Sequence, residues 1–249
     1  MKASIVALTQ PRVAGINTAE ELLAYVARVS NPANQGNTET APKLIKYLLK
    51  NAHWSPLEMV HVVFEIETTR DIARQILRHR SFSFQEFSQR YADPTKSLGF
   101  ELREARLQDK KNRQNSIEIL DENDLIAKEW KILQMGLIDE AQDVYEWAVS
   151  NGIAKEQARA VLPEGLTTSR LYMAGNLRSW HHYCSLRKGN GTQKEHREIA
   201  QAVWDALRID FPATTQAIDE IETESMVKTV KEYIYDYKEP PKKWWEFWK

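Results

Sequence analysis

The residues best suited to chemistry in this sequence are arginines, because residues 70–90 hold five of them against two carboxylates. Three recur at a spacing of four, which on a helix places them on one face: Arg70, Arg74 and Arg78. Like charges at that spacing destabilise a helix by roughly a few tenths of a kcal/mol per pair, so an anion opposite them would be stabilising. The planar guanidinium fork suits phosphate or carboxylate. The alternative is a structural ion-pair network with Glu65, Glu67 and Asp71.

A second basic segment, residues 176–187, predicts a helix with cationic groups on two sides. At 100° per residue, Arg178 and His182 share one face, whereas Arg187 points to the opposite side. Such a helix would serve two ligands, or one ligand and another subunit; the alternative is a surface helix with solvated basic ends. The net charge of the whole chain is −1, so two basic clusters favour a local anionic ligand over a nucleic-acid track.

Metal, phosphate-loop and thiol chemistry have less support. Adjacent His181 and His182 diverge by 100° on a helix, and no second histidine or glutamate stands at ligand spacing beside them, so no metal site is predicted. The sequence has no glycine-rich dinucleotide fingerprint, so any dinucleotide is expected to be held by side chains, mainly Arg. The single cysteine, Cys184, sits within the predicted helix, a position more typical of packing than of a nucleophile.

Composition bounds the class of protein. The chain has 249 residues, 42% hydrophobic and 28% charged, which is the balance of an ordinary soluble globular protein. No apolar run approaches the roughly 20 residues that span a bilayer. The N-terminal residues turn polar too soon for a secretory signal, and one cysteine gives no disulfide framework. A cytoplasmic protein is therefore expected.

Periodicity and capping signals predict the α/β class (mixed α+β), a single domain in which helices dominate a small sheet. Strands are expected at about residues 4–9, 60–68 and 167–173. Helices are expected at about 18–29, 41–51, 123–150, 176–188 and 193–209, with one after Thr69 and a short one carrying Arg159. Residues 81–91 give no clear pattern. The charged segment 101–118 is expected to form a mobile excursion.

The order of several motifs resembles one enzyme family. Arg78-His79-Arg80, followed after seven residues by Ser88, resembles the signature of the flavin-dependent thymidylate synthases, the ThyX family. Matching blocks occur in the same order at residues 53–58, 73–75, 88–91, 159–163 and 176–187. The resemblance covers about residues 3–207. It implies a fold of the thymidylate synthase-complementing type, with an enzyme domain at 1–220 and a C-terminal extension at 221–249.

The resemblance implies a methyltransferase that converts dUMP to dTMP. Methylenetetrahydrofolate would be the carbon donor, and FAD reduced by NADPH would be the hydride source. Relatives are homotetramers whose active sites are shared between subunits, so this chain is expected to be one too. No enzyme residue is expected to form a covalent bond to dUMP, because Cys184 carries no sign of activation and Ser88 has cations rather than a base nearby.

The resemblance also implies roles for individual residues. Residues at the positions that contact FAD in the family are Ser55, Arg78, His79, Arg80, Glu86, Asn176, Arg178 and His182. Residues at the positions that surround dUMP are Gln75, Arg78, Glu86, Ser88, Gln89, Arg90, Arg159 and Arg187. Two of these are assigned to catalysis: Arg187 would favour ionisation of the uracil ring, and Ser88 would position the nucleotide by a hydrogen bond.

The sequence also allows three further hypotheses. One is a nucleic-acid-binding module that uses the arginine helices with interleaved Phe82, Phe84 and Phe87. Another is a thymidylate synthase with Cys184 as nucleophile. The third concerns the tail, where Trp244, Trp245, Phe247 and Trp248 stand beside Lys242, Lys243 and Lys249. This cluster is of the kind that docks on a partner or membrane surface; the alternative is a tail that is disordered or folded onto its own subunit.

Overall fold

The computed structural model describes residues 1–121 and 123–238, with side chains described up to residue 230. The chain forms two compact units, each assembled from two separate stretches. Unit 1 comprises Met1–Gln10 and Leu57–Ala206, and unit 2 comprises Pro11–Pro56 and the residues from Leu207 onward. Because the chain crosses between them three times, no single linker marks the division in the sequence.

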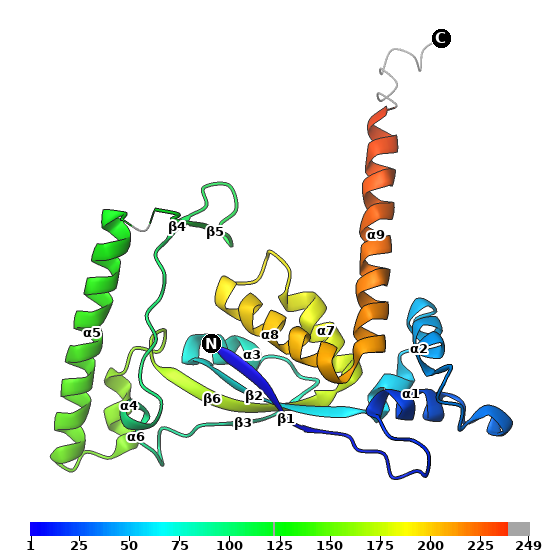
Figure 1. Ribbon diagram of the computed structural model, residues 1–249. Helices are drawn as coiled ribbons and strands as arrows, with labels where there is room; N and C mark the ends of the chain where they lie inside the picture. The colour runs from blue at the N-terminus through cyan, green and yellow to red at the C-terminus, as the bar shows by residue number, and fades with distance from the viewer. Residues whose placement is uncertain (122, 239–249) are drawn as a thin grey trace, which may run out of the picture. The chain divides into compact units, whose positions relative to one another are not determined.

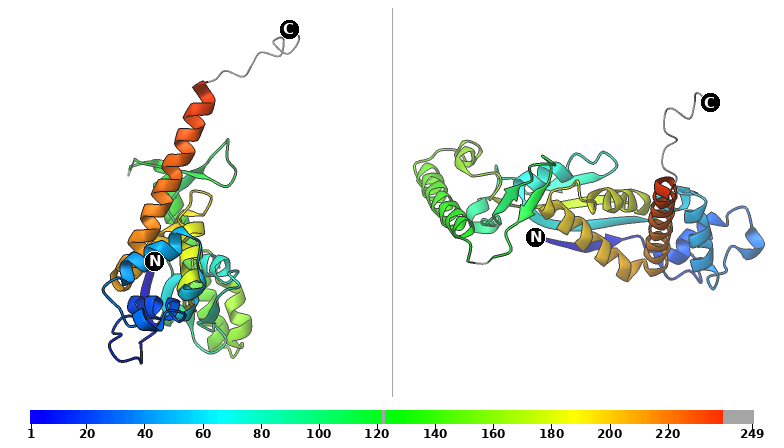
Figure 2. Two further views of the ribbon diagram at one scale, coloured as in Figure 1. Left: turned by 90° about the vertical axis from the view of Figure 1, so that its right-hand side faces the viewer. Right: turned by 90° about the horizontal axis from the view of Figure 1, so that it is seen from above.

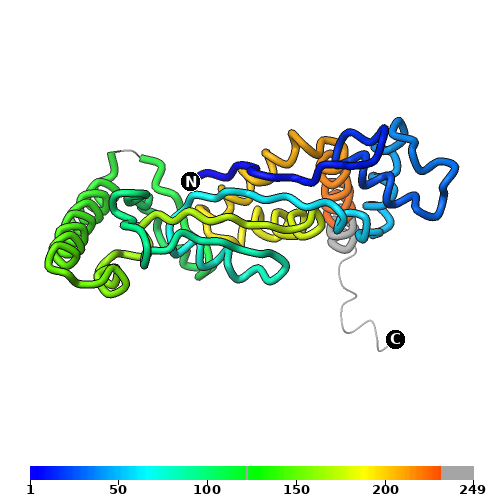
Figure 3. The backbone as a smooth tube through the Cα atoms, turned by 90° about the horizontal axis from the view of Figure 1, so that it is seen from below, coloured from blue at the N-terminus to red at the C-terminus, as the bar shows by residue number. Residues whose placement is uncertain are grey.

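A four-stranded antiparallel sheet is the centre of unit 1. Its order is β1-β2-β6-β3, and Figure 3 shows these strands side by side. The bounds are β1 Lys2–Leu8, β2 His61–Thr69, β6 Thr168–Asn176 and β3 Ser83–Glu86. The strands at 4–9, 60–68 and 167–173 are therefore confirmed. The fourth strand, β3, comes from the segment that gave no clear pattern, and its partner in the sheet is β6.

Helices cover one face of this sheet. They are α3 (Arg70–Ile76), α7 (Leu177–Arg187) and α8 (Lys194–Asp210), seen above the strands in Figure 1 and from above in Figure 2. The alternating residues Val62, Phe64 and Ile66 are fully buried on this face. Trp180 of α7 packs 4.7 Å from Phe64, measured between ring centroids, and its indole N–H donates to the Val62 carbonyl at 3.1 Å.

The helix after β2 is shorter than the spacing of its arginines suggests. It ends at Ile76, and the His79 N–H closes a turn onto the Ile76 carbonyl at 3.1 Å. Arg78 therefore lies in a turn, and only Arg70 and Arg74 share the helix. The predicted three-arginine face is wrong, because the chain turns here to enter β3, whose pairing with β6 is a long-range interaction.

A long helix and a strand pair complete unit 1. Helix α5 (Leu125–Ser150) begins at its cap Asp124 and ends before Gly152, whose φ of +84° suits glycine. The short elements are α4 Pro94–Ser97, α6 Lys155–Ala158 and the 3-10 helix Arg159–Val161. The segment expected to be a mobile excursion instead contains the antiparallel strands β4 (Arg106–Gln108) and β5 (Ser116–Glu118).

Buried ion pairs anchor that segment, which explains why its charges misled the prediction. Arg103 pairs with Asp71 at 2.6 Å, and Arg106 pairs with Glu195. The two arginine side chains are only 13% and 12% exposed. A high content of charge therefore marks internal anchoring here rather than solvation.

Unit 2 is helical. It contains α1 (Ala19–Ala27), α2 (Ala41–Lys50), α9 (Pro212–Lys238) and the 3-10 helix Pro32–Asn34; a further 3-10 helix, Ser55–Met59, leads toward β2. The capping box predicted at Thr18 and Glu21 is present. Glu20 accepts the N–H groups of Ala213 and Thr214 at 3.2 and 2.6 Å, which satisfies free donors at the start of α9.

The predicted boundary between residues 220 and 221 falls within α9, and as a statement about where the enzyme domain ends it stays a prediction. The aromatic residues proposed to dock, Trp244 to Trp248, lie outside the described residues. Among the residues that are described, no helix is both long and apolar enough to cross a membrane.

Candidate active site

The arginines of residues 70–90 divide into neutralised and available groups. Glu86 lies between Arg70 at 3.7 Å and Arg74 at 3.3 Å, and it accepts the Ser169 hydroxyl at 2.9 Å. These two arginines are therefore part of a structural network, but its carboxylates are Glu86 and Glu164 rather than the predicted Glu65, Glu67 and Asp71. Arg78 and Arg80 are exposed and have no ion-pair partner among the side chains of residues 1–121 and 123–230. These two guanidinium groups remain available for an anion.

His79, in the middle of the motif, is held against Arg187 of α7. The Arg187 Nε–H donates to His79 Nε2 at 2.9 Å. Burial lowers the pKa of His79 to about 4, with the nearby Arg187 charge as the second cause. His79 is therefore neutral near pH 7 and carries its proton on Nδ1. The pair presents a cation beside an uncharged ring, and among the described side chains no carboxylate pairs with Arg187.

A buried chain of hydrogen bonds lies next to this pair. His196 of α8 is fully buried, and its Nε2 is 3.2 Å from the Tyr183 hydroxyl. On its other side, His196 Nδ1 is 3.3 Å from Gln75 Oε1, and Gln75 Nε2 donates to Gln193 Oε1 at 2.9 Å. The rings of Tyr183 and His79 are 5.0 Å apart, so the chain reaches the His79–Arg187 pair through an aromatic contact. We call this row, Tyr183–His196–Gln75–Gln193, the buried chain after its buried members Tyr183 and His196; Gln75 is half-buried, and Gln193 at the end is exposed.

Tyr183, His196 and Gln193 were not among the site residues predicted from the sequence. One signal for His196 was present, because this histidine shares an apolar helix face with Ile199, Ala200 and Val203. A histidine on such a face is usually a buried, hydrogen-bonded group. Its partners lie 13 and 121 residues away along the chain, which no local pattern records.

The start of α7 places a second set of predicted residues together. Asn176 caps the helix, its side chain accepting the Ser179 N–H at 2.9 Å. Arg178 pairs with Glu58, and His182 is exposed one turn further along. Arg178 and Arg187 therefore contact different neighbours, as their helical spacing predicts. A helix N-terminus with an adjacent arginine is a favourable setting for a phosphate group.

The remaining predicted residues lie elsewhere. Ser88 accepts the Arg90 N–H at 3.3 Å, and Arg90 pairs with Glu156 of α6 at 3.1 Å. Gln89 is 4% exposed, and its Nε2 has no hydrogen-bond partner in the described part of the chain. Arg159 begins the 3-10 helix after α6 and lies close enough to Arg70 to lower its pKa, after burial as the main cause. Ser55 lies in unit 2, where it is exposed at the start of its 3-10 helix.

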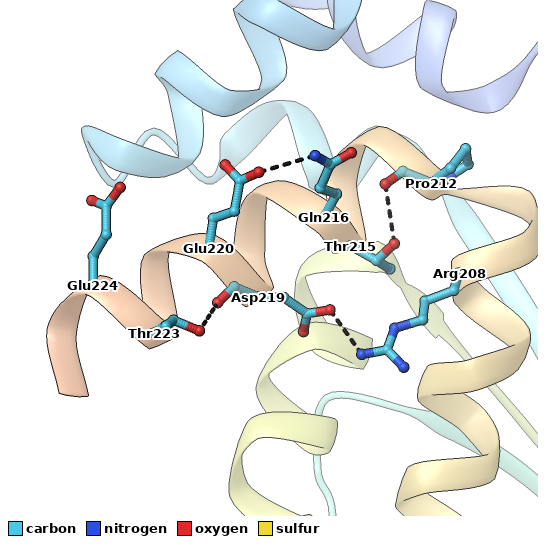
Figure 4. Close-up of a pocket in the computed structure, with 8 residues that line it drawn as sticks. All are labelled: Arg208, Pro212, Thr215, Gln216, Asp219, Glu220, Thr223 and Glu224. Atoms are coloured by element: carbon cyan, nitrogen blue, oxygen red, sulfur yellow. Dashed lines mark hydrogen bonds and ion pairs between the residues drawn. The ribbon is translucent and has the colours of Figure 1, made fainter. Parts of the chain in front are cut away.

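Two cavities are lined mostly by other residues; of the buried chain, Gln193 lines the first. One, of about 930 Å³, is lined by α5, the β4–β5 pair and the residues that begin α8, including Trp130, Leu133 and Arg197. The other, of about 630 Å³, is an open groove along α9 in unit 2, which we call the α9 groove (Figure 4). None of the predicted site residues lines either cavity.

The described part of the chain offers little for metal or thiol chemistry. Within it, no group of three or more His, Cys, Asp or Glu side chains is arranged to hold a metal ion. Cys184 is fully buried in α7, where it directly follows the buried Tyr183. A buried thiol in apolar surroundings is a poor nucleophile.

Comparison with known proteins gives these residues a context. The family model described as thymidylate synthase complementing protein matches residues 13–213. A protein of Paramecium bursaria Chlorella virus 1, described as a probable flavin-dependent thymidylate synthase, is 46% identical over 219 residues, 88% of this chain and 99% of the relative. The flavin-dependent thymidylate synthase of Synechocystis sp. is 46% identical over 223 residues, 88% of this chain and 100% of the relative.

A solved structure has the same fold. The UMP/dUMP methylase PolB from Streptomyces cacaoi, bound with 5-Br dUMP, matches with a TM-score of 0.71 at 24% sequence identity. The match covers 88% of this chain and 94% of the other. The predicted fold class, a mixed α and β chain with a small sheet, is confirmed.

Proposed function

Because the chain belongs to the thymidylate synthase complementing protein family, it is a methyltransferase of the flavin-dependent thymidylate synthase type, and we propose that it converts dUMP to dTMP with methylenetetrahydrofolate and NADPH. The observation that carries the assignment within the molecule is Arg187 on the neutral ring of His79. A cation without a carboxylate partner keeps its field for a ligand. Such a preorganised charge is usually a large contribution to catalysis.

We assign Arg187 to the uracil ring. Methylation needs an electron-rich C5, so negative charge develops on the ring and its carbonyl oxygens. The Arg187 guanidinium would stabilise that charge, and His79 would hold the guanidinium by accepting its Nε–H. His79 stays neutral while doing so, which avoids placing a second positive charge beside the first.

The residues present fit a flavin dinucleotide. Its diphosphate needs cationic donors, and Arg78 and Arg80 are exposed without carboxylate partners in the described chain. The capped start of α7 adds donors beside Arg178. We propose that FAD is held by these groups together with Ser55, His79, Glu86, Asn176 and His182. When bound and reduced by NADPH, it supplies the hydride for the methylation.

The proposed dUMP residues support a site shared between subunits. Gln75 and Arg187 are bonded to His196 and His79, whereas Arg90, two residues after Ser88, pairs with Glu156 of α6. The proposed dUMP residues of one chain therefore fall into two separately bonded sets. This division suits a homotetramer in which different copies contribute to each site. The unpartnered Gln89 amide and the unpaired Arg78 fit a polar nucleotide, and Arg159 and Glu86 would complete its surroundings.

We propose that the reaction proceeds without a covalent bond to the enzyme. Cys184 is fully buried, and the Ser88 hydroxyl accepts the Arg90 N–H rather than facing a base. Ser88 would instead orient dUMP by a hydrogen bond. A denatured enzyme trapped during turnover is expected to carry no nucleotide adduct at either residue, and mass spectrometry tests this.

The first experiment is a spectrum and an assay of the purified protein, proposed to be cytoplasmic. A flavin absorption band, with dTMP formed from dUMP in the presence of methylenetetrahydrofolate and NADPH, is the expected result. A colourless protein that neither takes up added FAD nor oxidises NADPH would contradict the proposal. Steeply salt-dependent binding to an oligonucleotide, without colour, would favour the nucleic-acid module instead.

A further inference from the structure

His196 has hydrogen-bonding capacity that packing alone does not require. It is fully buried, and both of its ring nitrogens have side-chain partners from other elements, Tyr183 of α7 and Gln75 of α3. An apolar residue of similar size would fill the space. It would also leave the Tyr183 hydroxyl buried without a partner and remove the donor to half-buried Gln75, at a cost in stability.

The direction of each hydrogen bond follows from the Gln75 side-chain oxygen, which has no proton to donate. Gln75 Oε1 only accepts, so His196 Nδ1 must carry the proton that is donated to it. A neutral imidazole has one N–H, so Nε2 is bare and accepts the Tyr183 O–H. With its oxygen held by His196, Gln75 turns its amide nitrogen to Gln193. The order of donors is therefore the same along the whole buried chain.

The surroundings keep His196 in this single state. Burial lowers the pKa of His196 to about 3, and the charge of Arg187 is the second cause. Protonation would give Nε2 a hydrogen aimed at the Tyr183 oxygen and would reverse that bond. Because the ring stays neutral near pH 7, the donor order does not change in the working range.

We propose that His196 is a positioning residue of the active site, which fixes the orientation of the Gln75 amide through Nδ1 while Nε2 holds the Tyr183 hydroxyl beside the His79–Arg187 pair. Gln75 is the residue through which His196 acts on the nucleotide. A misoriented amide would present nitrogen where oxygen belongs, which replaces an attractive contact by a repulsive one. The proposal rests on the proposed function, since it takes Gln75 as a contact of dUMP.

Two substitutions of His196 separate its two hydrogen bonds. In His196→Asn the side-chain amide reaches about as far as Nδ1 and can still donate to Gln75. In His196→Gln it reaches about as far as Nε2 and serves Tyr183 instead. We expect the KM for dUMP to rise roughly tenfold in His196→Gln and at most about threefold in His196→Asn, the scale of one misplaced contact. Flavin content should be unchanged in both variants.

A double-mutant cycle tests whether the effect passes through Gln75. If it does, His196→Gln combined with Gln75→Ala should have the same KM as Gln75→Ala alone. Cys184→Ala is the matched control, because it also removes a fully buried polar side chain from the neighbouring helix α7. It is expected to leave the KM unchanged.

The outcomes distinguish the proposal from a purely structural role. Equal KM values for the two His196 variants, or additive effects in the cycle, would overturn it, as would a rise in KM that only follows the loss in Tm. Should His196→Gln fail to fold, the Asn variant and Tyr183→Phe still test the separate bonds: the former is expected to keep the KM and the latter to leave it within about twofold. A wild-type protein without dUMP methylation would refute the proposed function itself, whereas active wild type with indistinguishable variants refutes only the role of His196.

Discussion

The buried chain of unit 1 and the α9 groove of unit 2 both contain polar side chains, all neutral in the buried chain but neutral and charged in the groove. Each is a row of polar side chains joined by hydrogen bonds at about the same lengths. In the α9 groove, Arg208 donates to Asp219 at 2.8 Å, and Gln216 donates to Glu220 at 3.0 Å (Figure 4). The two rows also differ in their exposure to solvent. His196 is fully buried, whereas the side chains of Arg208 and Asp219 are 47% and 36% exposed.

That difference decides what each row can do. Solvent replaces a lost partner in the α9 groove, so its ion pairs contribute little to stability. At Tyr183 and His196, which are fully buried, no solvent replaces a lost partner. These two groups are fixed in protonation and direction, and the charge of half-buried Arg187 is less screened there than at the surface. The contrast predicts a graded series of effects.

Arg187→Ala is expected to have the largest effect. Removing the cation should lower kcat by roughly two to three orders of magnitude, the scale of one lost electrostatic contact to developing charge. Flavin should stay bound, as measured by the absorption spectrum. Arg178→Ala, on the same helix but at its other end, should instead reduce flavin content. If both variants lose flavin equally and bind dUMP normally, the division of roles between the two arginines is wrong.

Acid should weaken the folded protein through the two buried imidazoles. The pKa values of His196 and His79 are about 3 and about 4, below the ordinary value of 6.5. Below about pH 6.5 these two histidines therefore bind protons in the unfolded chain but stay neutral in the folded chain, down to their lowered pKa values. Their contribution is fully present above about pH 6.5 and is lost as pH falls toward 3, by on the order of a few kcal/mol.

Urea unfolding at several pH values measures this loss. His196→Asn should flatten the decline between pH 6.5 and 4 compared with wild type, because it removes the more strongly shifted group. Other acidic and basic groups titrate equally in both proteins, so the difference isolates His196. Identical slopes would show that His196 is not held neutral by burial.

Tyr183→Phe should destabilise the protein by about 1–3 kcal/mol, because it leaves His196 Nε2 buried without a donor. Tyr172→Phe is the matched control. Tyr172 also donates its hydroxyl to a side chain, Glu65 at 2.6 Å, but it lies on an exposed part of β6. Its substitution should shift Tm far less. Equal shifts for both would mean that burial does not separate the two hydroxyls.

Asp219→Ala should have the smallest effect, below about 1 kcal/mol, since its pair with Arg208 is exposed to solvent. Methylation of dUMP and flavin content should match wild type, and thermal unfolding measures the stability. A loss comparable to that of Tyr183→Phe would mean that the α9 groove is covered in the working protein.

Local signals predicted most of the elements. Capping residues and apolar spacing placed α1, α2, α5 and α7 to within a few residues, because a helix makes its hydrogen bonds within four residues. Alternation predicted β2, because one of its faces is buried. The motif Arg78-His79-Arg80 with Ser88 identified the family, since the types and spacing of these residues are themselves the signal.

Interactions between distant segments decided the rest. The sequence could not show that α3 ends before Arg78, that residues 83–86 form a strand or that Glu86 neutralises Arg70 and Arg74. Each depends on β6, or on carboxylates placed by it, far along the chain. The charged segment 101–118 was misread for the same reason, since Asp71 and Glu195 are its partners.

The sequence by itself therefore determined the fold class, most of the helices and the family, and it supplied the arginines that are candidates for the chemistry. Only the tertiary structure decided which of those arginines remain unpaired and that His79 and His196 are neutral. The physical reason is that a side chain's charge state and free partners depend on burial and on groups brought close in space. For Gln75 and His196, 121 residues apart, only the packing of α3 against α8 brings them together.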